Sequence, residues 1–173
     1  FAGRIELWAI QRACAVRPWL VHELLSRSDT AIINIAETVT FGPPLHDSYF
    51  VSALSQSKFC LITRADSYST SAFYNAIQAG CLPVVISDWF VFSFWWAVAY
   101  EDFVIRISEE TFLSNPNEIL NTLLLEYSDE KVDKMREAMS KWKSLFEYND
   151  LNRNFSNRKM HSPLTLLMIE IRE

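Results

Sequence analysis

Two short apolar runs stand out along the chain, at residues 59–62 and 82–86. The second run is rich in β-branched residues, which is typical of a strand buried on both faces of a parallel sheet. Between the two runs, small and apolar side chains recur at helical spacing from about position 69 to position 79. A strand, a helix and a second strand in this order predict a right-handed βαβ crossover.

Residues with specific backbone preferences mark both ends of the predicted helix. Ser69 and Thr70 belong to the polar stretch before it and can act as N-caps, so we expect the helix to begin near Ser69. Gly80 is expected at the C′ position in the left-handed conformation. Pro83 lacks an N–H group and therefore suits the start of the next strand.

The rest of the chain continues the alternation of helices and strands. In chain order the pattern predicts a helix within 5–28 with Pro18 in its first turn, a central strand at 31–35, a loop at 36–46, a short helix at 47–55, a strand at 103–107, helices to about 124 and from 129 to 146, and a closing amphipathic helix at 160–171. Ser108 or Asn115 can cap the helices that follow the last strand. This order predicts an α/β fold with a doubly wound, mostly parallel sheet. We expect one domain over residues 1–147, to which residues 148–173 add a C-terminal loop and the closing helix.

The polar loop at residues 63–68 is the first candidate for a binding site. In open α/β sheets, ligands bind outside the carboxyl ends of the strands, where the next helix also points its unpaired N–H groups. The loop and the helix start therefore predict a cradle for a phosphate or another anion. A loop that is polar only because water surrounds it gives the same pattern, so both interpretations stay open.

Length and charge narrow the classes of function. With 173 residues, half of them apolar, the chain can bury one substantial core. A net charge of −5 argues against a general nucleic-acid binder, which needs a basic face. The sequence patterns of dinucleotide-binding loops, P-loop NTPases, zinc proteases and serine hydrolases do not occur.

The cysteines and the apolar runs indicate whether the chain has disulfides, metal sites or a membrane-spanning segment. Cys14, Cys60 and Cys81 lie in apolar surroundings without C-x-x-C spacing, so we expect buried free thiols rather than a zinc site or a disulfide framework. The longest apolar run, at residues 89–100, is shorter than the ~20 residues that span a bilayer. Because the chain begins at Phe1 without a methionine, inside an apparent strand, we expect it to be a piece of a longer polypeptide.

The block from Ser57 to Asp88 resembles the signature of the exostosin-like glycosyltransferases. It contains a strand with F-C-L, a helix ending in A-I-x-A-G-C and a strand with P-V-x-I-S-D. The resemblance implies the nucleotide-sugar-binding half of a GT-B fold, which transfers a sugar with inversion from a UDP-linked donor to a glycan or glycoprotein acceptor and needs no further cofactor. It also implies an N-terminal partner domain that is missing here. The expected location is the lumen of the Golgi or endoplasmic reticulum, as a single-pass type II membrane protein with its anchor outside this chain.

The same resemblance assigns residues to the donor site but leaves the catalytic base unknown. The donor would be held by the entry loop at Phe1–Arg4, by the loop after the strand and by the start of the helix, through Gly3, Arg4, Arg64, Asp66, Ser69, Thr70, Ser71 and Asn75. An arginine fork suits a diphosphate, although Arg4 can equally be a solvated loop residue. We expect the base to come from the missing domain or from the rim of the cleft.

The chain also departs from the family pattern, and this keeps other functions open. Ala65 stands where the family has a glycine, Ala72 where it has an arginine, Asn75 where it has an acidic residue and Ser93 where it has a proline. An impaired relative acting as a partner subunit or a glycan-binding module is therefore an alternative to an active enzyme. A third hypothesis is an unrelated doubly wound protein that binds a small phosphorylated ligand.

An aromatic segment follows the signature block, with seven Phe or Trp residues between positions 89 and 103. Rings at this place can stack on a base or a sugar. They can also pack in the core or contact the missing domain, and the sequence does not decide between these roles.

Overall fold

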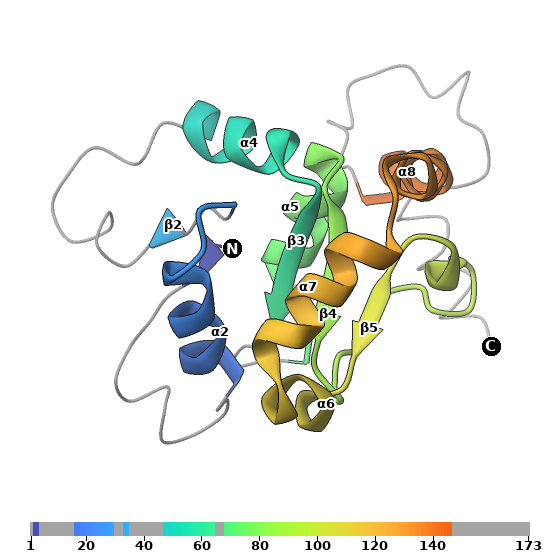
Figure 1. Ribbon diagram of the computed structural model, residues 1–173. Coiled ribbons are helices and arrows are strands. Elements are labelled where there is room, and N and C mark those ends of the chain that lie inside the picture. The colour runs from blue at the N-terminus through green and yellow to red at the C-terminus, as the bar shows by residue number, and fades with distance from the viewer. Residues whose placement is uncertain (1, 4–15, 30–32, 35–46, 65–67, 147–173) are drawn as a thin grey trace, which may run out of the picture.

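The computed structural model describes residues 2–3, 16–29, 33–34, 47–64 and 68–146, and it shows an α/β arrangement of helices around parallel strands (Figure 1). Four of the predictions made above lie outside the described residues: the loop at 36–46, the closing helix at 160–171, and the positions of Arg4 and Asp66. Ala65 and Cys14 also lie outside them.

The elements follow each other in nearly the predicted order. They are β1 (Ala2–Gly3), α2 (Val16–Leu25), β2 (Ile33–Asn34), α4 (Asp47–Gln56), β3 (Phe59–Thr63), α5 (Ser71–Ala79), β4 (Leu82–Ile86), a 3₁₀ turn (Tyr100–Asp102), β5 (Ile105–Ile107), α6 (Glu109–Ser114), α7 (Pro116–Glu126), α8 (Asp129–Lys143) and a second 3₁₀ turn (Ser144–Phe146). The α/β class is confirmed, and the sheet resembles one half of a Rossmann-like fold.

Parallel strands form two sheets in the described part of the chain. β3, β4 and β5 lie side by side in this order, and β1 pairs with β2 in a separate two-stranded sheet. The predicted βαβ crossover is β3–α5–β4, with Phe59 opposite Leu82 and Thr63 opposite Ile86. It is therefore confirmed in both its elements and its parallel pairing.

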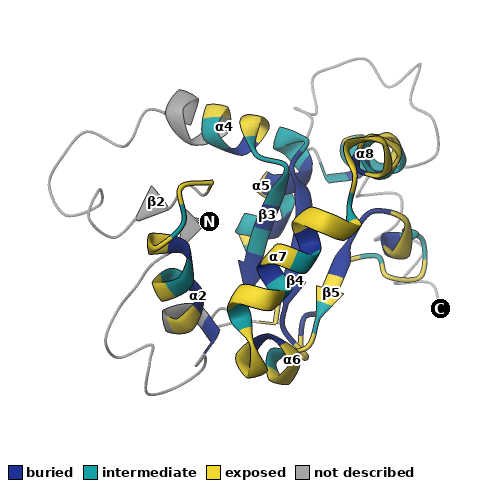
Figure 2. Ribbon diagram, in the orientation of Figure 1, coloured by how far each residue is buried: buried dark blue, intermediate teal, exposed yellow. Residues whose placement is uncertain are grey.

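Helices cover both faces of the three-stranded sheet, so the sheet is the middle of three layers. One core joins Val84, Ile86 and Ile105 to apolar side chains of α2, α6 and α7. The other core joins Val85 to side chains of α5 and α8 and to the aromatic segment. All five residues of β4 are buried, which explains its uninterrupted apolar sequence (Figure 2).

The predicted helix caps and strand start within the crossover are also confirmed. Thr70 is the N-cap of α5, so the helix begins at Ser71, two residues after the expected start. Gly80 has φ 80° and closes α5 in the left-handed region. Leu82 donates its N–H to the carbonyl of Lys58, which lies on the β3 side. Because successive residues of a strand point their backbone N–H groups to opposite neighbours, the nitrogen of Pro83 faces the β5 side. Pairing with β5 begins only at Val84. The missing N–H therefore breaks no ladder bond.

Local capping decides where the later helices begin and end. The helix expected to run to about residue 124 is two helices, α6 and α7, because Pro116 has no N–H and Asn115 caps α7 by accepting from Glu118. Ser108 caps α6 by accepting from Thr111, so both predicted caps are used. α8 ends at Lys143 and continues as the 3₁₀ turn over residues 144–146.

The prediction of free thiols is wrong for two of the cysteines. Cys60 and Cys81 form a disulfide, and both side chains are buried. Cys60 lies opposite Pro83 in the β3–β4 register, and Cys81 is two residues before Pro83 on the same side of the chain. Their closeness follows from this register, which their separation of 21 residues in the sequence does not reveal.

Candidate active site

The carboxyl ends of β3, β4 and β5 lie at one edge of the sheet, at the bottom of Figure 1. We call this the carboxyl-end edge. Three segments leave the strands there: the donor loop, defined here as Tyr68–Thr70 before α5, the aromatic segment Ser87–Tyr100 after β4, and the short connection from β5 to α6. The edge therefore gathers the predicted helix start and the aromatic residues in one region.

The N-terminus of α5 faces this edge, but the capping residue Thr70 already accepts hydrogen bonds from some of its backbone N–H groups. Thr70 Oγ1 accepts a hydrogen bond from the N–H of Ala72 at 3.3 Å, and Phe73 donates its N–H to the Thr70 carbonyl at 3.1 Å. Only some of the N–H groups expected for an anion are thus left at this helix start. The exposed Ser71 hydroxyl and the half-buried Ser69 and Thr70 are the polar side chains beside it.

Arg64 and Asn75 extend the candidate site on either side of the donor loop. Arg64 follows β3 directly and is half-buried. Asn75 is exposed on α5, four residues after Ser71, so the two side chains share one face of the helix. The structure thus brings the described loop and helix residues of the predicted site to one region.

Gly3 does not belong to the sheet that carries the other described residues of the predicted donor site. It lies in β1, opposite Asn34 of β2, and belongs to the two-stranded sheet. The role of the entry loop therefore stays a prediction, because Arg4 lies outside the described residues.

Two carboxylates at the edge were not predicted as site residues. Asp88 follows β4 and accepts a hydrogen bond through Oδ1 from the N–H of Glu109, the first residue of α6, at 3.3 Å. Glu109 Oε1 is buried and has no hydrogen-bond partner in the described part of the chain. The position of Asp88 two residues after the end of a buried strand was the sequence signal for this pair.

The aromatic segment divides into a buried part and an exposed part. Phe90, Phe92 and Tyr100 are buried against Phe73 of α5, with ring centroids 5.1, 5.3 and 6.0 Å from it. In contrast, the exposed aromatic side chains are indoles: Trp89 is 63% exposed, Trp95 70% and Trp96 41%. Core packing is therefore the role of the phenylalanines at 90 and 92, and the tryptophans remain available to a ligand or another protein surface.

Backbone strain marks the turn between these two parts. Phe94 has φ 55°, a left-handed conformation that is rare for a bulky residue. Such strain costs about 1–3 kcal/mol and persists only where surrounding contacts impose it. Here the contacts include the hydrogen bonds that Ala97 and Val98 donate to the Phe94 carbonyl, at 2.9 and 3.1 Å.

The pKa of one hydroxyl in the segment is shifted. Burial raises the pKa of Tyr100 far above its usual range, and the nearby Tyr74 adds to the effect. Tyr100 is therefore a neutral donor at any physiological pH, and it donates to the Ser93 carbonyl at 2.5 Å.

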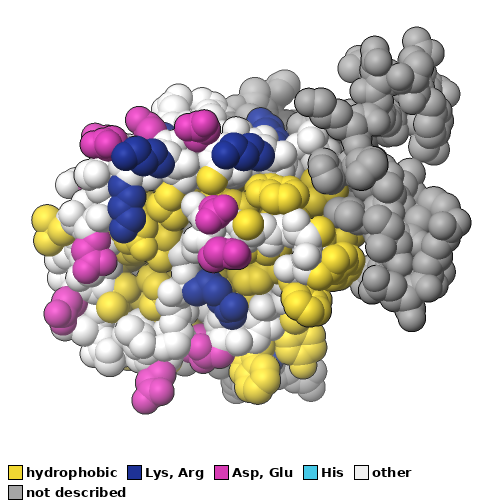
Figure 3. Space-filling model, turned by 90° about the vertical axis from the view of Figure 1, so that its right-hand side faces the viewer, with side chains coloured by type: hydrophobic (Ala, Val, Ile, Leu, Met, Phe, Trp, Pro, Cys, Tyr) yellow, Lys and Arg dark blue, Asp and Glu magenta, His cyan; other side chains and the backbone are white. Residues whose placement is uncertain are grey.

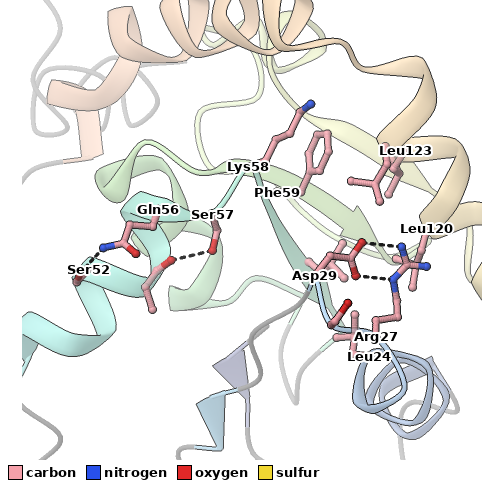
Figure 4. Close-up of a pocket in the computed structure, with 14 residues that line it drawn as sticks. Leu24, Arg27, Asp29, Ser52, Gln56, Ser57, Lys58, Phe59, Leu120 and Leu123 are labelled. Carbon is pink, nitrogen blue, oxygen red and sulfur yellow. Dashed lines mark hydrogen bonds and ion pairs between the residues drawn. The ribbon is translucent and has the colours of Figure 1, made fainter.

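A pocket of about 770 Å³ lies elsewhere, beside the first residues of β3 (Figure 4). It is lined by residues of α2, α4, β3 and α7 and by the segments that follow α2 and α4, and Arg27 and Asp29 face each other across two hydrogen bonds there. Arg27 also donates to Asn117 and Asn121 of α7. None of the described donor-site residues lines this pocket, so its size does not make it the active site.

α8 presents a solvated face, as its alternating charges predict. Glu130 pairs with Lys134 at 2.8 Å within the helix, and Asp129 pairs with Lys58 at 2.7 Å. Figure 3 shows acidic and basic side chains interspersed on this side of the molecule, next to hydrophobic ones.

The described residues contain neither a metal-binding cluster nor a membrane-spanning helix. No group of three or more His, Cys, Asp or Glu side chains in these ranges could hold a metal ion. Among the helices described here, none is both long and apolar enough to cross a bilayer.

Comparison with known proteins identifies the family. The family model of the exostosin GT47 domain matches residues 1–123, well over half of the chain. The chain belongs to the exostosin GT47 family. The matched region includes every strand that the structure describes, the donor loop and the aromatic segment.

Two exostosins are similar to the chain over shorter stretches. The exostosin-1 homologue of Caenorhabditis elegans is 32% identical over 85 residues, which are 49% of this chain and 21% of that protein. Exostosin-1 of Drosophila melanogaster is 32% identical over 73 residues, which are 42% of this chain and 10% of that protein. The chain thus corresponds to about a fifth or less of the length of these exostosins.

The structure gives a physical setting to two departures from the exostosin pattern. Ala72 is half-buried and packs against the core beside α5, where the family pattern has an arginine. Asn75 is exposed and uncharged, where the pattern has an acidic residue. The helix face beside the donor loop is therefore uncharged at the two positions where the resemblance described above implies an arginine and an acidic residue.

Proposed function

We propose that this chain is the nucleotide-sugar-binding half of an exostosin-type glycosyltransferase with a GT-B fold. The enzyme would transfer a sugar with inversion from a UDP-linked donor to a glycan or glycoprotein acceptor, with no further cofactor. The observation that carries this proposal is the family match over residues 1–123, which contain the β3–α5–β4 crossover and its carboxyl-end edge. It also argues against the hypothesis of an unrelated doubly wound protein.

The described residues suit the leaving diphosphate better than the acceptor. Negative charge grows on the diphosphate as the bond to the sugar breaks, and fixed donors at that place lower the barrier. Arg64 would supply a charged fork, and Ser69, Thr70 and Ser71 would supply hydroxyl groups and a helix start. Asn75 would hydrogen-bond the ribose or sugar hydroxyls. The base that takes the acceptor's proton would come from an N-terminal domain or the cleft rim.

The Cys60–Cys81 disulfide supports a lumenal location. Disulfides persist in oxidising compartments and are rare in the cytosol, where thiols are kept reduced. We therefore propose the lumen of the Golgi or endoplasmic reticulum, with a single-pass type II anchor outside this chain.

Calorimetric titration of the full-length protein with UDP and with UDP-sugars tests the proposal. Binding of UDP and of at least one UDP-sugar is the expected result, with ADP as the control for base selectivity. No heat with any nucleotide or nucleotide sugar would overturn it.

A second candidate is an impaired relative that serves as a partner subunit or a glycan-binding module. The neutral residues Ala72 and Asn75 beside the donor loop favour it, because neither can supply the charge that the family pattern has there. Release of the sugar from a UDP-sugar, or its transfer to a glycan, would exclude this candidate. A retained fold without turnover would support it.

A further inference from the structure

The Tyr74 hydroxyl lies between two segments that leave different strands. It is 2.6 Å from Ser93 Oγ in the aromatic segment and 3.3 Å from Ser69 Oγ in the donor loop. Ser69 precedes α5 and Ser93 follows β4. The Tyr74 side chain therefore links the donor loop to the aromatic segment at the carboxyl-end edge.

Packing fixes the position of this hydroxyl. The Tyr74 ring lies edge-on to Phe73 at 5.3 Å and packs on Phe146 at the same distance. Ser93 is held as well, because its carbonyl accepts from the Tyr100 hydroxyl. The bond between Tyr74 and Ser93 therefore joins two side chains that have little freedom to move apart.

The backbone adds a second connection between the same two segments. Val91 donates its N–H to the carbonyl of Tyr68 at 2.8 Å. The donor loop is thus tied to the aromatic segment at Tyr68 through the backbone and at Ser69 through Tyr74.

We propose that Tyr74 is a positioning residue, which holds the donor loop against the aromatic segment in the conformation that receives the nucleotide diphosphate. This inference rests on the proposed function and names a residue that the family resemblance does not assign. A loop that is ordered before binding loses less conformational entropy when the ligand arrives, so the ligand binds more tightly. Of the contacts described above between the donor loop and the aromatic segment, loss of the Tyr74 hydroxyl would leave the Val91–Tyr68 hydrogen bond.

The test compares three variants of the full-length protein: Tyr74→Phe, Ser93→Ala and their combination. Tyr74→Phe keeps the ring and removes the hydroxyl, and Ser93→Ala removes the other partner while keeping the carbonyl that Tyr100 uses. Tyr127→Phe is the matched control, because the Tyr127 ring packs on Phe59 at the start of β3. UDP affinity is measured by calorimetry, and amide hydrogen exchange of residues 68–71 is measured without ligand.

Faster exchange at residues 68–71 and UDP binding that is about two- to tenfold weaker are expected for Tyr74→Phe, the range for one ordinary hydrogen bond. Ser93→Ala should act in the same direction, and the double variant should be no worse than Tyr74→Phe alone, because Tyr74→Phe already removes the bond to Ser93. The thermal unfolding midpoint and the control variant should stay close to the wild type.

Unchanged exchange or unchanged UDP affinity in Tyr74→Phe would overturn the positioning role while the wild type still binds UDP. Fully additive effects of the two substitutions would overturn it as well, because the residues would then act separately. If the wild type binds no nucleotide, the proposed function fails, and the positioning role falls with it.

Discussion

Cys60 in β3 and Cys81, directly before β4, are bonded across the crossover with their Cα atoms 5.8 Å apart. The bond closes a loop that contains the donor loop and the whole of α5, the segment on which the candidate site is built. The disulfide thus joins the two ends of this segment near the amino ends of β3 and β4, away from the carboxyl-end edge.

Removal of this disulfide should destabilise the domain. The double variant Cys60→Ala/Cys81→Ala is expected to lose about 3 kcal/mol of unfolding free energy, because the unfolded chain gains the freedom of a loop of this length. Urea unfolding of both proteins measures the difference. A reducing agent should destabilise the wild type and leave the double variant unchanged. Equal stability of the two oxidised proteins would contradict a structural role for the bond.

Arg64→Ala should weaken UDP binding more than the removal of one positive charge from a site remote from the donor loop. A charged hydrogen bond is worth about 1.5–3 kcal/mol, so the affinity should fall by about tenfold or more. Lys134→Ala on α8 is the control, since it removes one positive charge from a side chain that is 72% exposed. Calorimetry gives both affinities. If the two variants bind UDP equally well, Arg64 has no direct part in holding the diphosphate.

The buried ring cluster around Phe73 of α5 and the exposed tryptophans of the aromatic segment should differ in what they contribute to stability. Phe73→Ala is expected to cost about 3–5 kcal/mol, because Phe73 is fully buried among Phe90, Phe92 and Tyr100. Trp95→Ala removes a ring that is largely exposed and should change stability by no more than about 0.5 kcal/mol. Denaturant unfolding of both variants checks the contrast. A large loss for Trp95→Ala would show that the exposed ring supports the fold after all.

Acid should weaken the contact between α2 and α7 through Asp29. Arg27 donates to both Asp29 oxygens, at 2.9 and 2.8 Å, and this hydrogen bonding lowers the pKa of Asp29 below its ordinary value. A lowered pKa stabilises the folded state above the unfolded-state pKa near 4, and the contribution is lost as the pH falls through the folded-state value.

Asp29→Asn should therefore be less stable than the wild type at neutral pH, by no more than ~1 kcal/mol because the carboxylate is half-exposed. Below about pH 4 the two proteins should converge. Unfolding curves over this pH range measure the difference, and added salt should reduce it. A difference that is the same at every pH would assign the effect to something other than the charge of Asp29.

Several parts of the fold follow from short stretches of sequence. The positive φ of Gly80, the cap at Thr70 and the break between α6 and α7 at Asn115 and Pro116 depend on residues within one helical turn. The crossover itself spans fewer than 30 residues, and its two apolar runs and the helical spacing between them are each a local pattern. Local backbone preferences act at this range, so the sequence predicts such features directly.

The Cys60–Cys81 bond, the outward tryptophans and the contact of Tyr74 with both Ser69 and Ser93 could be read only from the folded chain. Each depends on which residues of separate segments lie opposite one another, and that is set by strand register and core packing. The spacing of the apolar runs located the carboxyl-end edge, and the motifs of the Ser57–Asp88 block carried the resemblance to the family. The side chains that meet there were decided by the packing of β4 between two layers of helices, because only a buried central strand holds all the segments that leave the sheet in fixed relation to one another.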